Sequence, residues 1–179
     1  MSKKLLSISA IGKDQTGIVS SISKVLFELG CNIENSTMTL LSGQFAMILL
    51  IAYPKTLAVS KIKTKLKSAL NKLGLFSSLN EIDDNTKHIK TYGDYVISVY
   101  GADKPGIVYN ITKYLSDNRI NITDVQTTVV GSKEKVYIML LEIQIPKNFK
   151  IENLKSAMND LSKKLTVDIS INQADTAEI

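Results

Sequence analysis

The chain has 179 residues, of which 44% are hydrophobic and 22% charged, and its net charge is +5. This is the composition of an ordinary globular protein, with a length that allows one medium domain or two small ones. The longest apolar run, residues 45–53, is much shorter than the roughly 20 residues that a membrane-spanning helix needs. Cys31 and His88 are each the only residue of their type, which excludes an intramolecular disulfide and a Cys/His zinc site. We therefore expect a cytoplasmic protein with no catalytic residues, no metal and no cofactor.

The first half of the chain reads as strand, helix, strand, strand, helix, strand. Apolar residues recur with a period of two in the strands and at helical spacing in the helices, and glycines end the helices. The predicted strands are residues 4–11, 33–40, 44–52 and 75–82, and the predicted helices are residues 18–29 and 60–73.

The second half repeats this order because the sequence itself is repeated. Residues 12–19 return as residues 101–108 with five of eight positions identical, and residues 45–54 match residues 137–146 after an insertion around residues 131–135. We predict two domains, residues 1–82 and 93–172, a linker of residues 83–92 and a tail of residues 173–179. The second domain's predicted elements are strands 95–101, 122–130, 136–145 and 167–171 and helices 107–115 and 154–165.

A doubled strand, helix, strand unit with right-handed crossovers predicts an α+β, ferredoxin-like fold. Each domain is then a four-stranded antiparallel sheet with two helices on one face. The strands at residues 45–53 and 136–143 barely alternate between apolar and polar side chains. We therefore expect something to cover the other face of each sheet as well.

The positive charge is concentrated in the first domain, where ten lysines face four acids. Most of the excess lies on or beside the predicted helix at residues 60–73, whose apolar positions face inward. Two interpretations remain open, a solvated helix face and a nucleic-acid surface. The first is favoured because the chain has one Arg and no Trp. The lysines concerned are Lys55, Lys61, Lys63, Lys65, Lys67 and Lys72.

The turn between the first strand and the first helix of each domain is the densest feature of the repeat. It reads Asp14-Gln15-Thr16-Gly17 in one copy and Asp103-Lys104-Pro105-Gly106 in the other. Backbone N–H groups at a helix N-terminus favour an anion, glycine leaves them accessible, and proline suits the first helical turn. The turn therefore predicts a cradle for the carboxylate of a small ligand. The alternative is that Asp14 and Asp103 cap the helices.

A second polar group begins the following strand, with Asn32 and Asn35 in the first copy and Asn121 and Asp124 in the second. We expect these residues to lie beside the turn, where their oxygens could accept an ammonium group. Carboxylate donors and ammonium acceptors together would suit a free amino acid, whereas the alternative is a purely structural pair of turns. Cys31, which corresponds to Ile120, reads as a small buried hydrophobic residue.

Both copies share a strand ending in Gly-x-Asp-x-x-Gly-Ile-Val, a helix, and an Asn-Ile pair that begins the second strand. On these motifs the chain resembles a tandem ACT domain protein, and Gly43-Gln44-Phe45-Ala46-Met47 is similar to the group of the glycine cleavage system transcriptional repressor. The resemblance implies that ACT units pair into a larger sheet and bind an effector at the seam. The site residues that it implies are Asp14, Gln15, Thr16, Gly17, Asn32 and Asn35, and Asp103, Lys104, Pro105, Gly106, Asn121 and Asp124.

The resulting hypothesis is a non-enzymatic regulatory protein that binds a small amino acid and modulates a partner, such as a transcription regulator. We expect the protein itself to be a homodimer or larger oligomer. The alternatives are a nucleic-acid-binding protein that uses the lysine-rich helix and a module that only oligomerises. An enzyme such as an acylphosphatase is disfavoured because that activity needs an Arg in the first turn. Arg119, the only Arg, follows the helix.

Overall fold

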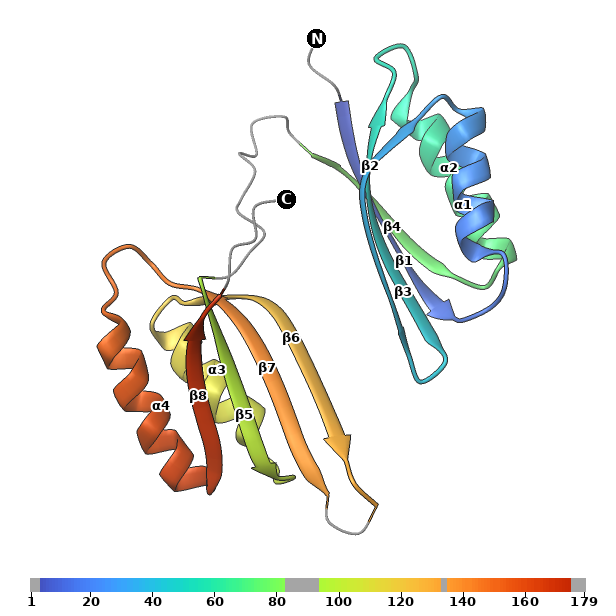
Figure 1. The fold of residues 1–179 in the computed structure, drawn as a ribbon. Coiled ribbons are helices and arrows are strands. Elements are labelled where there is room, and N and C mark those ends of the chain that lie inside the picture. Colours follow the sequence, from blue (N-terminus) through green and yellow to red (C-terminus); the bar gives the residue numbers. More distant parts are fainter. Residues whose placement is uncertain (1–3, 83–93, 133–134, 175–179) are drawn as a thin grey trace. The chain divides into compact units, whose positions relative to one another are not determined.

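The computed structural model describes residues 4–82, 94–132 and 135–174, and the chain divides into two compact units, residues 1–87 and 88–179 (Figure 1). The predicted linker, His88, part of the inserted loop and most of the predicted tail lie outside the described residues. Each unit has its own hydrophobic core, so each is described by itself.

The first unit is a four-stranded antiparallel sheet in the order β2-β3-β1-β4. The strands β1 and β3 lie in the centre, and β2 is an outer strand that is exposed along its whole length. Its elements are β1 (Lys4–Lys13), α1 (Ile18–Glu28), β2 (Asn32–Leu41), β3 (Gln44–Tyr53), α2 (Val59–Lys72) and β4 (Phe76–Ile82).

The second unit repeats this topology in the order β6-β7-β5-β8, with β6 as the outer strand equivalent to β2. The predicted ferredoxin-like fold, with its strand and helix order, is therefore confirmed in both units. The elements are β5 (Tyr95–Ala102), α3 (Ile107–Asp117), β6 (Asn121–Val130), β7 (Val136–Gln144), α4 (Ile151–Leu165) and β8 (Val167–Gln173).

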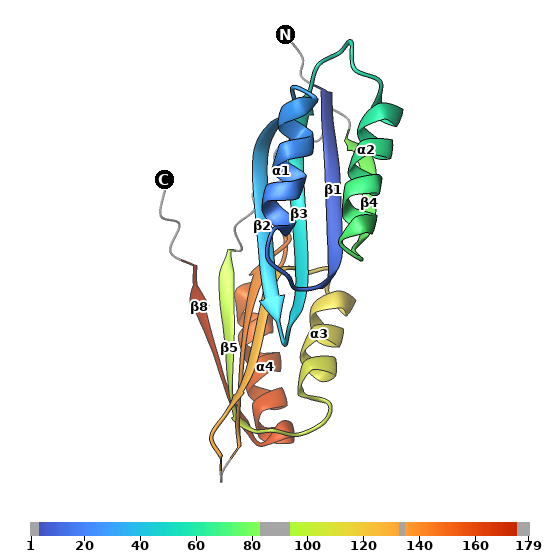
Figure 2. The same ribbon diagram turned by 90° about the vertical axis from the view of Figure 1, so that its right-hand side faces the viewer.

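Each helix buries one apolar stripe against its sheet. In α1 the buried residues Ile18, Ile22 and Leu26 are spaced by four, which places them on one face of a helix. In the first unit, α1 and α2 lie on the same face of the sheet (Figure 2), and their stripes meet the inward side chains of β1 and β3 in one core. No polar or charged residue is buried among the described residues. The packing is therefore of the usual hydrophobic kind.

Candidate functional site

The turn between β1 and α1 is built around a glycine in a left-handed conformation. Gly17 has φ 95° and is the N-cap of α1, and Gly106 has φ 97° and is the N-cap of α3. Glycine adopts this conformation at little cost. Neither helix has a side-chain cap hydrogen bond, so the interpretation of Asp14 and Asp103 as caps is wrong. Pro105 lies before the N-cap, and not in the first helical turn as its sequence position suggested.

In the first unit, two hydrogen bonds fix the turn to its neighbours. The Asp14 N–H donates to the carbonyl of Gly43, at the tip of the β2–β3 hairpin, at 2.9 Å. The Gln15 amide donates to the carbonyl of Leu73, just beyond α2, at 2.5 Å. The Ser21 N–H donates to the carbonyl of Gly17, the N-cap, at 2.9 Å. The backbone N–H groups of residues 18–20 come before it in the chain, where a helix offers no carbonyl of its own to accept from them. The predicted carboxylate cradle thus lies at the N-terminus of α1.

Asn32 and Asn35 lie at the opposite end of the same sheet, so the prediction that they adjoin the turn is wrong. Lys13 pairs with Gln44, whereas Asn32 pairs with Ala52, eight residues further along β3. At the rise of a β-strand this separates the two polar groups by about 26 Å. The reason is visible in Figure 1, where α1 runs back along the sheet, so β2 begins at the same end of the sheet as β1 does.

The second unit shows the same separation. Ala102 pairs with Val136 and Asn121 pairs with Gln144, again eight residues apart on β7. The sequence-predicted residues within each unit therefore form two groups, one at each end of the sheet. No single unit brings the carboxylate cradle and the ammonium acceptors together.

A β-bulge shapes the start of β2 and of β6. The register shifts between Ile33 and Asn35, and equally between Ile122 and Asp124. In the first unit the Asn32 amide donates to the Glu34 carboxylate at 3.1 Å. In the second unit the Gln126 amide donates to the Asp124 carboxylate at 3.1 Å. Both outer strands thus begin with an irregular polar segment, which sequence periodicity alone did not reveal.

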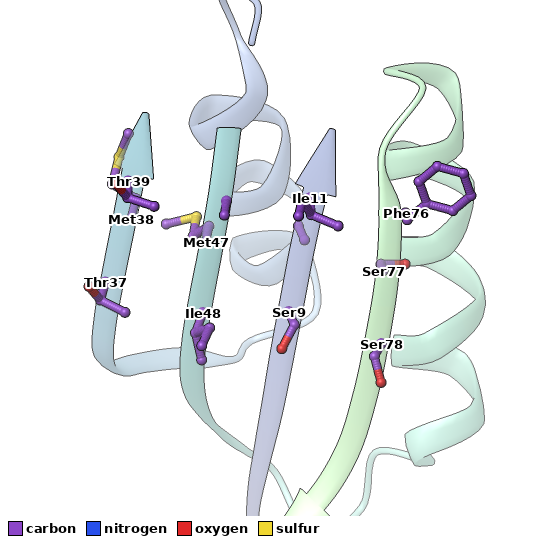
Figure 3. Close-up of a pocket in the computed structure, with 12 residues that line it drawn as sticks. Ser9, Ile11, Thr37, Met38, Thr39, Met47, Ile48, Phe76, Ser77 and Ser78 are labelled. Carbon is purple, nitrogen blue, oxygen red and sulfur yellow. The ribbon is translucent and has the colours of Figure 1, made fainter. Parts of the chain in front are cut away.

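The open face of the first sheet carries an apolar hollow of about 470 Å³ (Figure 3). Its lining side chains include Ile11, Ile48 and Phe76, which are 55%, 53% and 79% exposed. We expected this face to be covered, but the described residues of this unit leave it open. The equivalent of Phe76 in the repeat is Asp168, which pairs with Tyr100 as Phe76 pairs with Ile11. The two open faces therefore differ chemically although the folds match.

The pKa values of Tyr137 and Cys31, which lie at the cores of the two units, are both raised. Burial raises the pKa of Tyr137, and the Asp103 carboxylate of the second turn raises it further. Burial also raises the pKa of the Cys31 thiol. Cys31 is only partly buried and packs against the edge of the first core, so its prediction as a buried hydrophobic residue holds in part. A raised thiol pKa means little thiolate and low reactivity.

Residues 4–82, 94–132 and 135–174 contain no group of three or more His, Cys, Asp or Glu side chains placed to hold a metal ion. None of the helices in those ranges is long and apolar enough to cross a membrane.

Comparison with known proteins gives matches over most of the chain. The chain is 26% identical to the glycine cleavage system transcriptional repressor of Escherichia coli over 174 residues, which are 96% of this chain and 90% of that protein. A UPF0237 protein of Methanocaldococcus jannaschii is 39% identical over 69 residues, 38% of this chain and 77% of that protein. The crystal structure of an unknown protein from Galdieria sulphuraria superposes with a TM-score of 0.84 at 25% identity, covering 97% of this chain and 99% of that one.

The family assignment comes from a model of the ACT domain, which matches residues 4–79 and again residues 94–172. These ranges coincide with the two sheets and their helices. The protein therefore belongs to the ACT domain family and carries two ACT domains in tandem.

Proposed function

We propose that the protein is a non-enzymatic regulator that binds a small amino acid at a seam between paired ACT sheets. The observation that carries this proposal is the placement of the two polar groups at opposite ends of one sheet, beside an outer strand with no partner on its outer side among the described residues. A single sheet cannot close the site, whereas two sheets paired along that strand can.

The pairing follows from the geometry of β2. An exposed outer strand of ten residues is a template for a further strand. When two copies of β2 pair antiparallel across a two-fold axis, the start of each strand lies beside the end of the other. Asn32 and Asn35 of one copy then approach the Gly43 hairpin and the Gly17 turn of its partner. This arrangement gives an eight-stranded sheet with two equivalent sites.

The chemistry of the combined site suits a zwitterion. The turn at Gly17 supplies N–H donors for a carboxylate, with the backbone N–H of Thr16 among them, and the helix N-terminus supplies a positive dipole end. The side-chain oxygens of Asn32 and Asn35 supply acceptors for an ammonium group.

The second unit has the same framework with different residues. Pro105 replaces Thr16 and removes one N–H donor, Lys104 replaces Gln15, and Asp124 replaces Asn35. Asp124 also accepts a hydrogen bond from Gln126. We therefore assign the stronger carboxylate cradle to the first unit, with Asp103, Lys104, Pro105, Gly106, Asn121 and Asp124 as a variant site of different charge.

Regulation would follow if the effector binds one state of the protein better than another. The similarity to the glycine cleavage system transcriptional repressor supports a role in the transcriptional control of amino-acid metabolism. In that role the protein acts on a partner, such as a transcription regulator, and the amino acid changes the affinity for it.

The proposal is tested by isothermal titration of the common amino acids into the full chain. Binding of at least one of them is expected, with loss of binding at the first unit in Thr16→Pro and in Asn35→Ala. Thr16→Pro copies the residue of the second turn, so the fold should accept it. Asn80→Ala, an exposed strand residue away from both polar groups, serves as the control and should bind normally. If no amino acid binds at millimolar concentration, the proposal is wrong.

A further inference from the structure

The outer face of α2 is more basic than the fold requires. The helix carries Lys61, Lys63, Lys65, Lys67 and Lys72 and no acidic residue. All are exposed except Lys63, which is half-buried. The equivalent helix α4 is an internal control, because it packs in the same way with three lysines and two acids, Glu152 and Asp160. The shared architecture therefore does not explain the charge of α2.

This charge pattern also opposes the stability of α2. Lys61 and Lys65 are four residues apart, as are Lys63 and Lys67, and like charges at this spacing repel. Lys61 lies in the first helical turn, where the dipole favours acids, and α2 has no acid there. The second unit instead pairs opposite charges on α3, where Lys113 and Asp117 lie 2.9 Å apart. Local features that disfavour folding are typical of functional surfaces.

A groove runs between α1 and α2 beside these lysines. It encloses about 580 Å³, and small residues such as Ser68 and Ala69 leave room between the helices. Lys65 and Lys72 line the α2 side, and Glu28 is the acidic residue on the α1 side. Val25, Ala69 and Leu73 give the groove an apolar component. An apolar groove beside lysines is complementary to an amphipathic segment with acidic flanks.

We propose that the α1–α2 groove is a docking surface for an acidic amphipathic helix of a partner protein. Apolar side chains of that helix fill the groove, and its carboxylates meet Lys65 and Lys72. A protein segment fits better than nucleic acid. The phosphate backbone makes no use of the apolar side chains in the groove, and α1 and α2 contain no Arg. The regulatory meaning of this contact rests on the proposed function, whereas the contact itself does not require the amino-acid site.

The experiment measures fluorescence anisotropy with the full chain and three labelled probes, in the absence of amino acids. The first probe is a five-turn peptide of about 18 residues with Leu on one helical face and Glu on the other. The second is a scrambled peptide of the same composition, and the third is duplex DNA of similar length. The variant is Lys65→Glu with Lys72→Glu. The control is Lys155→Glu, which makes the same kind of charge change on α4.

The amphipathic peptide should bind about tenfold or more tightly than the scrambled peptide and than DNA. The double variant should weaken that binding by about tenfold or more, with unchanged circular dichroism, and Lys155→Glu should bind as the wild type does. Equal binding of the two peptides, tighter binding of DNA, or wild-type affinity in the double variant would each overturn the proposal. None of these readouts depends on amino-acid binding, so failure here is separate from failure of the proposed function.

Discussion

Replacing Lys61 by Glu should stabilise the first unit, although the substitution reverses a charge on the lysine-rich helix α2. The Lys61 N–H donates to the Ala58 carbonyl at 3.0 Å, and Ala58 is the N-cap, which makes Lys61 the third helical residue. A glutamate there interacts favourably with the helix dipole, by about 0.3–1 kcal/mol. It also replaces the repulsion between residues 61 and 65 by an attraction. The loss of the repulsion and the gain of the attraction each contribute about 0.2–0.5 kcal/mol.

Together these effects predict a gain of about 1 kcal/mol, or a rise of roughly 4–8 °C in the Tm of a unit of this size. Urea and thermal unfolding at low and at high salt would measure it, and salt should reduce the gain because Lys61 is exposed. Lys61→Gln, which removes the charge without reversing it, should give about half of the effect. A loss of stability in Lys61→Glu, or a gain that salt leaves unchanged, would refute the electrostatic reasoning.

Three other predictions concern the core, the open sheet face and the pH dependence. Leu26→Ala should lower the unfolding free energy of the first unit by about 3–5 kcal/mol, because the Leu26 side chain is fully buried. Urea unfolding measures this loss, and a loss below about 1 kcal/mol would contradict the packing. Phe76→Asp, which copies Asp168, should reduce the fluorescence of the dye ANS bound to the hollow without lowering stability, and unchanged fluorescence would place the dye elsewhere. Tyr137→Phe copies Phe45 of the first unit. The pKa of Tyr137 is higher in the native protein than in the unfolded chain, so as the pH rises the unfolded chain loses the phenol proton first. The stability of the wild type therefore falls as the pH rises above about 10. The variant should lose less stability over that range in pH-dependent unfolding, and parallel curves would argue against the shift.

Much of the fold was predictable because its signals are local and occur twice. Apolar residues spaced by four in α1, such as Ile18 and Ile22, recur in α3 as Ile107 and Ile111. The match between residues 12–19 and 101–108 then fixed the two copies in register. Periodicity needs no knowledge of tertiary contacts, so element types and order were confirmed, with boundaries within a few residues.

The geometry of the site was less predictable, because it depends on where elements end in space. Asn32 follows Gly17 closely in sequence, but α1 lies between them and carries the chain back toward the other end of the sheet. The sequence likewise suggested caps at Asp14 and Asp103, whereas the structure places left-handed glycines at both caps. Short polar residues and glycines compete for the same turns, and only the backbone conformation decides between them. Whether the twelve candidate residues bind a ligand stays a prediction.

Mixing two defective chains tests the shared site most directly. Thr16→Pro damages the carboxylate cradle and Asn35→Ala damages the ammonium side, and each variant alone should bind no amino acid at the first unit. If the site combines the turn of one copy with the β2 of its partner, then half of the dimers in an equal mixture are mixed, and each mixed dimer holds one intact site. Titration of the re-equilibrated mixture should therefore recover about one quarter of the wild-type sites at wild-type affinity. A mixture that binds no more than the separate variants would contradict a site shared between two copies of β2.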